Sequence, residues 1–345
     1  MQIGILSSTL IGPGSSKPAL ELQDLVDLPE RVRGGYVVIG NFDGVHLGHR
    51  HIVQRASNLA KMDSAKLIAI TFDPHPRSFL EPHQTLLPLT DQDEKAYLLR
   101  KAGVDEVIVL NFDSSLSSQP AKDFVEGVLV KQFEARGIVA SRNFRFGLNR
   151  AGDAAQLASI GPGLGLVVEL IPPQVDYDTD EPISSTAVRA KLALGEVKSA
   201  NRMLGRRWTF EGEIVHGDKR GRELGFPTAN IATGFGSSLC FGIYAVRVLV
   251  DDIVADGVAC YGTRPQFDDG APRLEVHILN FSGDLYGKQM IVEFVAFLRP
   301  ERTFVSVDAL KDQIGRDCAL AKSYIGSDVE ASTFDTDFAH ILTPR

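Results

Sequence analysis

The sequence has few cysteines and no long apolar run. Its three cysteines, Cys240, Cys260 and Cys318, lie far apart and include no C-x-x-C pair. This spacing argues against a disulfide framework or a cysteine zinc site, and it is typical of reduced thiols in a reducing compartment. No basic region with a following apolar core and cleavage site opens the chain, and no apolar run is long enough to cross a bilayer. We therefore expect a cytoplasmic protein without a membrane partner.

Positive charge is also in short supply. The chain has 36 lysines and arginines against 44 aspartates and glutamates, which gives a formal net charge of −8. Because nucleic-acid backbones select for clustered Lys and Arg, we expect no nucleic-acid partner. An anionic small molecule is still compatible with this charge, since local fields and backbone amides can differ in sign from the whole chain. With 345 residues, the chain is long enough for two domains of ordinary size.

A glycine-rich turn, GNFDGVHLGH at residues 40–49, is the most informative stretch. It follows an apolar run at 36–39, which predicts a buried strand, and it precedes residues with helical spacing. Glycines let a backbone approach a ligand closely, and a helix start offers free N–H groups and a partial positive charge, so the turn suits phosphate. His46 and His49, three residues apart, add donors that can face the same phosphate. The alternative is a tight turn with exposed histidines.

The N-terminal half alternates between short β-rich runs and helical stretches. The predicted strands are 36–39, 67–71, 107–112, 138–141 and 166–171, and the predicted helices are 49–61, 91–101, 120–135 and 153–160. Such alternation implies right-handed crossovers and a parallel sheet, that is, a Rossmann-like α/β fold. Ligands bind at the carboxyl ends of the strands in such sheets, where His46 and His49 are placed.

The pattern changes after Gly205. Short runs separated by Gly, Asp or Pro clusters predict strands at 208–216, 242–251, 257–261, 274–281 and 290–298, which implies an antiparallel sheet closed into a small barrel. A last helix capped by Ser306 carries an apolar stripe that should pack on the barrel, namely Val307, Leu310, Ile314, Cys318 and Ala321. We place domain boundaries after residue 204 and after residue 326, with a polar tail at 327–345.

Three other segments of the N-terminal half carry polar chemistry. TFDPHP at 71–76 is a proline-fixed extended turn, or merely a rigid connection. NFRFG at 143–147 is a loop that offers Asn143, or merely buries two phenylalanines. ISSTAVR at 183–189 gathers hydroxyls and an arginine at a helix start, which suits a triphosphate. Its alternative role is structural, with Ser185 as the cap of a helix that runs to Ala193.

One segment of the C-terminal half, residues 212–230, has the sequence GEIVHGDKRGRELGFPTAN. The glycines and basic residues of its loop can form an anion cradle. Thr228 and Asn230 are alternate residues of an extended segment, so both side chains can point the same way with oxygens suited to Mg²⁺. The alternative is a solvated basic loop followed by an edge strand. Further along, Glu275 begins a strand, where a glutamate usually faces solvent.

These motifs resemble those of the bacterial bifunctional riboflavin kinase/FAD synthetases. The likeness runs over roughly residues 36–322 and includes two independent motif sets in the family's order. In that family an N-terminal module adenylylates FMN and a C-terminal module phosphorylates riboflavin. The resemblance implies a nucleotidyltransferase domain at 1–204 and a riboflavin kinase domain at 205–326. It also implies riboflavin, FMN and ATP as substrates, FAD as product and Mg²⁺ as cofactor.

The resemblance also implies roles for single residues. His46, His49 and Glu275 would be catalytic, Phe72 and Pro74 would bind flavin, and Thr228 and Asn230 would bind the metal. The residues implied in nucleotide binding are Gly40, Phe42, Gly44, Asn143, Ser184, Ser185, Thr186, Arg189, Gly217, Arg222 and Gly225.

Two positions depart from the family pattern. Ser141 stands where the family often has glycine, and Gln266 stands where it has threonine. Two rival functions therefore stay open: a nucleotidyltransferase for another phosphorylated substrate, and a flavin-binding or regulatory protein that has lost one activity. The sequence also leaves open whether the chain forms a homo-oligomer.

Overall fold

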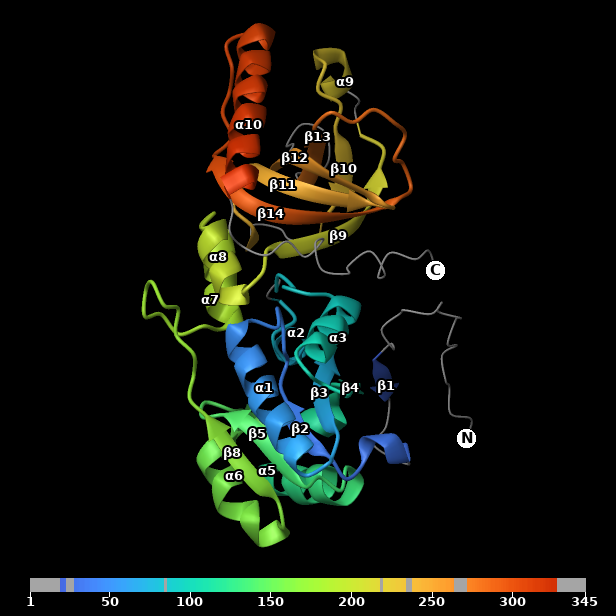
Figure 1. Cartoon of the computed structure of the whole chain (residues 1–345), viewed down its shortest axis with the longest axis vertical. Helices are drawn as coiled ribbons and strands as arrows, with labels where there is room; N and C mark the ends of the chain where they lie inside the picture. Colours follow the sequence, from blue (N-terminus) through green and yellow to red (C-terminus); the bar gives the residue numbers. More distant parts are fainter. Residues whose placement is uncertain are drawn as a thin grey trace.

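The computed structural model describes residues 19–22, 28–83, 86–217, 220–233, 238–263 and 272–327, without the side chains of residues 220 and 223. An α/β domain lies at one end of the molecule and a β-barrel at the other (Figure 1). The predicted fold class is thereby confirmed. Gln266 and the tail from residue 328 lie outside the described residues.

The α/β domain is built on a six-stranded sheet of order β1-β4-β3-β2-β5-β8, in which each neighbouring pair is parallel. These strands are Leu20–Leu22, Glu106–Asn111, Leu67–Asp73, Tyr36–Ile39, Gly137–Ser141 and Val167–Ile171. The chain passes from β2 to β3 and β4 on one side, and β5 and β8 lie on the other. A crevice for ligands is expected where the strand order reverses, between β2 and β5.

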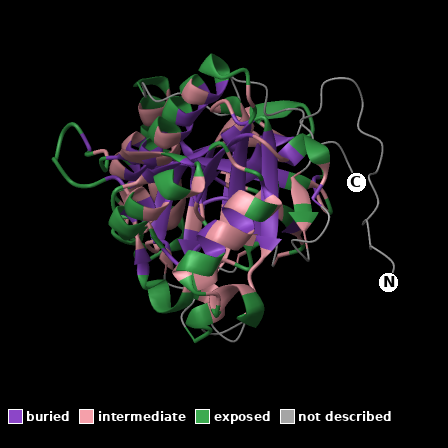
Figure 2. Ribbon diagram, turned by 90° about the horizontal axis from the view of Figure 1, so that it is seen from below, coloured by how far each residue is buried: buried purple, intermediate pink, exposed green. Residues whose placement is uncertain are grey.

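Helices cover both faces of this sheet, which explains why its strands are continuous apolar runs. Val37 and Ile39 of β2 face a core that includes a π-helix at Phe124–Gln132 and helix α6 at Ala154–Ile160. Tyr36 and Val38 face the opposite core, with helices α1 (Leu47–Met62) and α3 (Gln92–Lys101). Figure 2 shows the buried strands between more exposed helices. The four predicted helices are present.

One predicted helix has a different form. Residues 120–135 were expected to be one α-helix, but only Ala121–Asp123 (α5) is α-helical before the π-helix. The wider turn is visible in the hydrogen bond from Phe133 N to Val128 O, at 3.0 Å, which spans five residues. The short elements that the sequence did not predict include the edge strand β1, and also α2 (Pro76–Leu80), α4 (Ser114–Ser117), β6 (Arg145–Phe146) and β7 (Gly152–Asp153).

The C-terminal part is a closed barrel of order β10-β13-β12-β11-β14-β9, with antiparallel neighbours. Its strands are Ala229–Ala232, Arg273–Ile278, Ile253–Gly262, Gly242–Val250, Gln289–Arg299 and Trp208–Val215. All five predicted strands are present. The closing strand β10 was not predicted, and the alternative of an edge strand is wrong because β10 pairs on both sides.

Helix α10 (Val307–Ser327) packs on the barrel through its C-terminal part only. Ala321 is fully buried and Cys318 packs beside it, whereas Val307 is 57% exposed. The expectation that the whole apolar stripe packs on the barrel is therefore wrong: Val307, Leu310 and Ile314 lie outside this cluster, and the stripe packs only through Cys318 and Ala321. Ser306 caps the helix as predicted, since its Oγ accepts from Ala309 N at 3.1 Å.

One apolar core contains residues from both sides of the predicted domain boundary at residue 204. Helices α7 (Ser185–Ala193) and α8 (Val197–Leu204) join the barrel interior in a single cluster, together with Leu87 and Leu89. Trp208, the first residue of β9, is buried there, and its indole N–H donates to Leu89 O at 3.2 Å. The barrel and the α/β domain are thus held together by buried contacts.

Candidate functional site

The glycine-rich turn lies at the carboxyl end of β2, next to the point where the strand order reverses. Its two histidines stack with ring centroids 3.6 Å apart. His46 is buried and His49 half-buried, so the alternative of exposed histidines is wrong. A Cβ on Gly48 would come within 3.1 Å of the His46 ring, so any larger residue would push this ring aside.

His46 is the N-cap of α1, because its Nδ1 accepts from His49 N at 3.3 Å. Burial lowers the pKa of His46 to about 4, and it also places the pKa of His49 well below its ordinary value. Both rings are therefore neutral near pH 7. Since Nδ1 of His46 accepts a hydrogen bond, its proton resides on Nε2, where it can be donated to a phosphate oxygen.

The Phe42 side chain packs against the ring of His49. It is 2% exposed, and its ring meets His49 edge-on at 5.2 Å. Gly40 lies above the same ring. The Phe42 side chain is thus closed off from a ligand, so any nucleotide contact by this residue is made by its backbone. Gly44 is buried, and its N–H donates to Thr90 Oγ1 at 3.1 Å.

The start of α7 lies against the same turn. Ser184 is the N-cap, with its Oγ accepting from Ala187 N at 3.1 Å. The prediction that Ser185 caps this helix is therefore wrong. Ser185 is one residue inside, and its hydroxyl donates to Asp43 O at 2.9 Å. Thr186 is exposed at the same helix start.

Arg189 is tied to the turn by a buried ion pair with Asp43 and by a 2.6 Å hydrogen bond from its Nε to Leu87 O. The other carboxylate oxygen of Asp43 accepts from Leu89 N and Thr90 N, at 2.9 and 3.3 Å. Asp43 thus joins α7, the turn and the segment before α3. The predicted contact of Arg189 with a triphosphate stays a prediction.

Asn143 is exposed just after β5, the strand that neighbours β2 and its histidine turn in the sheet. Ser141 donates to Asn143 Oδ1 at 2.6 Å, so the residue that departs from the family pattern orients this amide and leaves its NH₂ group for a ligand. The alternative of a phenylalanine pair is also present, since Phe144 and Phe146 stack at 5.2 Å. The two interpretations of this segment are compatible.

Aromatic rings gather at the ends of β3 and β4. Phe72 and Phe79 each meet Phe112 edge-on at 5.6 Å, and all three are half-buried. Pro74 is exposed beside them. Such rings could stack on a flat heterocycle. Phe79 and Phe112 were missed from the sequence, although Phe112 ends a predicted strand and its position could have revealed it.

A second candidate site lies on the barrel. A hollow of about 80 Å³ is lined by Arg222, Pro227 and Thr228, by apolar barrel residues, and by the turn at 281–286. Gly217 and Gly225 belong to the loop before it. A Cβ on Gly217 would lie 2.4 Å from Asn230 Nδ2, so glycine is required for the loop to pass over Asn230.

The predicted metal ligands and the predicted base share the outer face of the barrel. Asn230 on β10 is the register partner of Glu275 on β13, so their side chains are neighbours. Ala229 and Ile231 pack toward the interior, so Thr228 and Asn230 point outward together. Asn230 Oδ1 is buried and has no hydrogen-bond partner among the described residues. An unpaired hard oxygen beside a carboxylate fits a divalent cation such as Mg²⁺.

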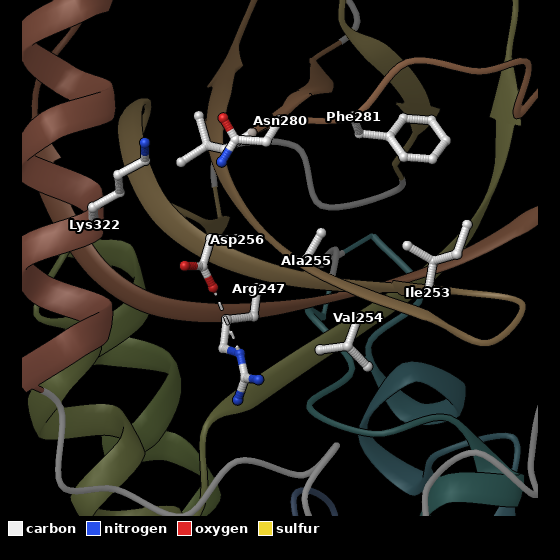
Figure 3. A pocket seen from close by; sticks show the side chains of 9 residues that line it. Arg247, Ile253, Val254, Ala255, Asp256, Asn280, Phe281 and Lys322 are labelled. Atoms are coloured by element: carbon white, nitrogen blue, oxygen red, sulfur yellow. Dashed lines mark ion pairs between the residues drawn. The ribbon is translucent and has the colours of Figure 1, made fainter.

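A larger hollow of about 410 Å³ lies between the barrel and α10 (Figure 3). Arg247 and Asp256, which are partners on the neighbouring strands β11 and β12, form an ion pair at 3.8 Å in its lining, and Lys322 lines it from α10. Its lining includes none of the residues predicted for either site. Size alone therefore does not identify the reactive site.

Comparisons with known proteins match each half of the chain to a separate family model. A family model described as FAD synthetase matches residues 28–187, and one described as riboflavin kinase matches residues 204–325. A bifunctional riboflavin kinase/FMN adenylyltransferase from Pseudomonas fluorescens is 37% identical over 303 residues, which cover 88% of this chain and 96% of that protein. The protein of the same description from Escherichia coli K12 is 36% identical over 294 residues, 85% of this chain and 93% of the relative.

Among solved structures, a Streptococcus pneumoniae protein described as a macrolide-efflux protein is 31% identical. It aligns with a TM-score of 0.80 over 88% of this chain and 98% of that one. In the described part of the present chain, no helix is both long and apolar enough to span a membrane.

Proposed function

Because this chain belongs to the bifunctional riboflavin kinase/FMN adenylyltransferases, and is an enzyme with both of their activities, we propose which of its residues carry each step. ATP phosphorylates riboflavin to FMN, and a second ATP adenylylates FMN to FAD with release of pyrophosphate. We assign the first step to the barrel and the second to the carboxyl edge of the sheet. The adjoining domains would be residues 205–326 and 1–204.

For adenylyl transfer, the FMN phosphate attacks the α-phosphorus of ATP, the new P–O bond forms, and the bond to pyrophosphate breaks. The FMN phosphate is already ionised, so this step requires positioning and charge stabilisation more than a strong base. His46 and His49 would donate N–H groups to the α-phosphoryl oxygens. The support for this assignment is their neutral, stacked placement at the helix start.

The other ligands of this site would surround the histidine turn. The start of α7, with Ser184, Ser185 and Thr186, offers hydroxyl and N–H donors for the β- and γ-phosphates. Asn143 would direct its NH₂ group to the nucleotide. The cluster of Phe72, Phe79 and Phe112 would bind the isoalloxazine ring of FMN.

For phosphorylation, the riboflavin 5′-hydroxyl attacks the γ-phosphorus of ATP, and ADP leaves. A hydroxyl is a weak nucleophile, so Glu275 would take its proton. Thr228 and Asn230 would hold Mg²⁺, which when bound neutralises charge on the phosphate oxygens. The unpaired, buried Oδ1 of Asn230 next to Glu275 is the observation that carries this assignment.

The nucleotide of the kinase step would enter the hollow beside Arg222 and Thr228. That hollow is smaller than the roughly 300–1,000 Å³ of typical small-molecule sites and is open to solvent, so it would hold only part of the ATP molecule. Cys240, Cys260 and Cys318 are free thiols, in line with a proposed cytoplasmic location. We propose no nucleic-acid or membrane partner.

Chromatographic separation of flavins tests the assignment. The chain is incubated with ATP and Mg²⁺, once with riboflavin and once with FMN. We expect riboflavin to yield FMN and then FAD, and FMN to yield FAD directly. FMN that accumulates without FAD would refute the adenylylation step, and tight flavin binding without turnover would favour the regulatory alternative.

A further inference from the structure

The segment that joins the two domains lies against the histidine turn. The Leu204 side chain is 3.1 Å from where a Cβ on Gly44 would stand. A Cβ on Gly205 would meet Leu47 Cδ2 at 2.5 Å, and Gly205 O accepts from Arg50 Nη1 at 3.5 Å. Leu47 and Arg50 belong to the first turn of α1. The next residue along the chain, Arg206, is therefore brought to the helix start that His46 caps.

Arg206 is 6% exposed, and only part of its guanidinium is satisfied. Its Nη2 donates to Glu94 Oε1 at 3.0 Å, and Thr209 Oγ1 donates to the same oxygen at 2.7 Å. Nε and Nη1 of Arg206 are buried and have no hydrogen-bond partner in the part of the chain that the structure describes. Buried donors without partners are rare in folded proteins, so they point to an anionic ligand that is yet to bind.

The charge of this guanidinium reaches the histidine site. Its charge contributes to the lowered pKa of His46, as that of the buried Lys95 does for His49. The neutral histidines bring no charge to a triphosphate, and Arg189 is engaged with Asp43 and Leu87. A further cation would strengthen the hold of this site on a triphosphate, and Arg206 is held where it can serve as one.

We propose that Arg206 is a phosphate-binding residue of the adenylylation site, presented by Glu94 and Thr209 from the junction between the domains. The inference rests on the proposed location of that site at His46 and His49. Its consequence is that the site is completed by a residue beyond the α/β domain. An ATP phosphate oxygen would accept from the free Nε and Nη1 of Arg206.

Charge-matched variants of the full chain test the proposal. Glu94→Gln keeps Arg206 and removes its counter-charge, whereas Glu94→Gln/Arg206→Gln removes both charges and leaves no buried charge unpaired. We expect Glu94→Gln to raise the KM for ATP in FMN adenylylation far less than the double variant does, because its amide oxygen can still accept from Arg206 Nη2. We expect the double variant to raise that KM by about 10- to 100-fold, the range for loss of hydrogen bonds to a charged group.

Riboflavin phosphorylation in the same samples is the internal control and should change by less than about twofold. Arg206→Lys keeps the positive charge but cannot donate two parallel hydrogen bonds as a guanidinium does. Its KM for ATP should therefore lie between those of wild type and the double variant. An unchanged KM for ATP in the double variant would overturn the proposal. A parallel fall of both activities would also overturn it, because it would indicate a structural role. Wild-type protein that makes no FAD would instead refute the proposed function.

Discussion

The lowered pKa of His46 makes the stability of the unliganded protein depend on pH in a defined direction. The folded protein holds this imidazole neutral down to about pH 4, whereas the unfolded chain takes up the proton near pH 6.5. The folded state therefore binds fewer protons over this interval. The stabilisation is fully present above pH 6.5 and is lost as the pH falls toward 4. A tenfold change in proton affinity is worth about 1.36 kcal/mol, so the loss amounts to about 3 kcal/mol.

His46→Asn isolates this contribution. Asparagine is also a good N-cap, so the variant keeps the cap of α1 and loses only the titrating ring. Urea unfolding of both proteins from pH 7.5 to pH 4 gives the two stability curves. Other groups contribute to each curve, including Glu94, whose burial raises its pKa to about 7 and so acts in the opposite direction. Groups that do not contact His46 contribute nearly equally to both proteins. The stacked His49, whose pKa His46 also lowers, titrates differently in the two, so the difference reports on the histidine pair.

We expect the stability advantage of wild type over His46→Asn to shrink by about 3 kcal/mol between pH 6.5 and pH 4. A difference that stays constant with pH would refute the argument that His46 is held neutral. The same would then apply to its proposed role as a neutral N–H donor in phosphate binding.

Three further substitutions have distinct expected outcomes. His49→Ala should slow FAD formation from FMN by about 10²–10³-fold and leave FMN formation intact, as followed by flavin chromatography. Glu275→Ala should have the opposite effect: riboflavin phosphorylation should slow by about 10²–10⁴-fold, while FAD still forms from added FMN. Equal loss of both steps in either of these folded variants would contradict the two-site assignment. Asn201→Ala should lower the free energy of unfolding by about 1–3 kcal/mol in urea titrations, because Asn201 is buried and bonds Phe294 O and Trp208 N, both at 2.9 Å; an unchanged midpoint would argue against this bridge.

The sequence predicted the fold well where periodicity decides it. Parallel strands buried on both faces give continuous apolar runs between helical stretches, and the barrel strands are short runs separated by Gly, Asp or Pro clusters, so both were recognised. Strand β10 has four residues and follows a proline, which is too short for a period to appear. The π-helix at 124–132 was missed because its residues keep a helical spacing and only the hydrogen-bond pattern differs.

The motifs indicated which segments carry the candidate site residues, but not the contacts that join those segments. Phe42 belongs to the glycine-rich turn, yet its side chain is buried under His49 and does not face the crevice. The pairing of Asp43 with Arg189 joins residues 146 positions apart. Arg206 gave no signal of its own in the sequence, since its place beside His46 depends on how the junction packs against α1. Contacts of this kind depend on tertiary structure, which a local motif does not contain.

Mixing two variants that each lack one of the two activities is the most direct test of two separate flavin sites on one chain. His49→Ala and Glu275→Ala are each incubated with riboflavin, ATP and Mg²⁺, alone and together, and FAD is measured. We expect that neither variant alone forms FAD from riboflavin at an appreciable rate. The mixture should form FAD, because FMN released by His49→Ala is adenylylated by Glu275→Ala. A mixture of two folded variants that accumulates FMN without FAD, or makes neither product, would contradict it.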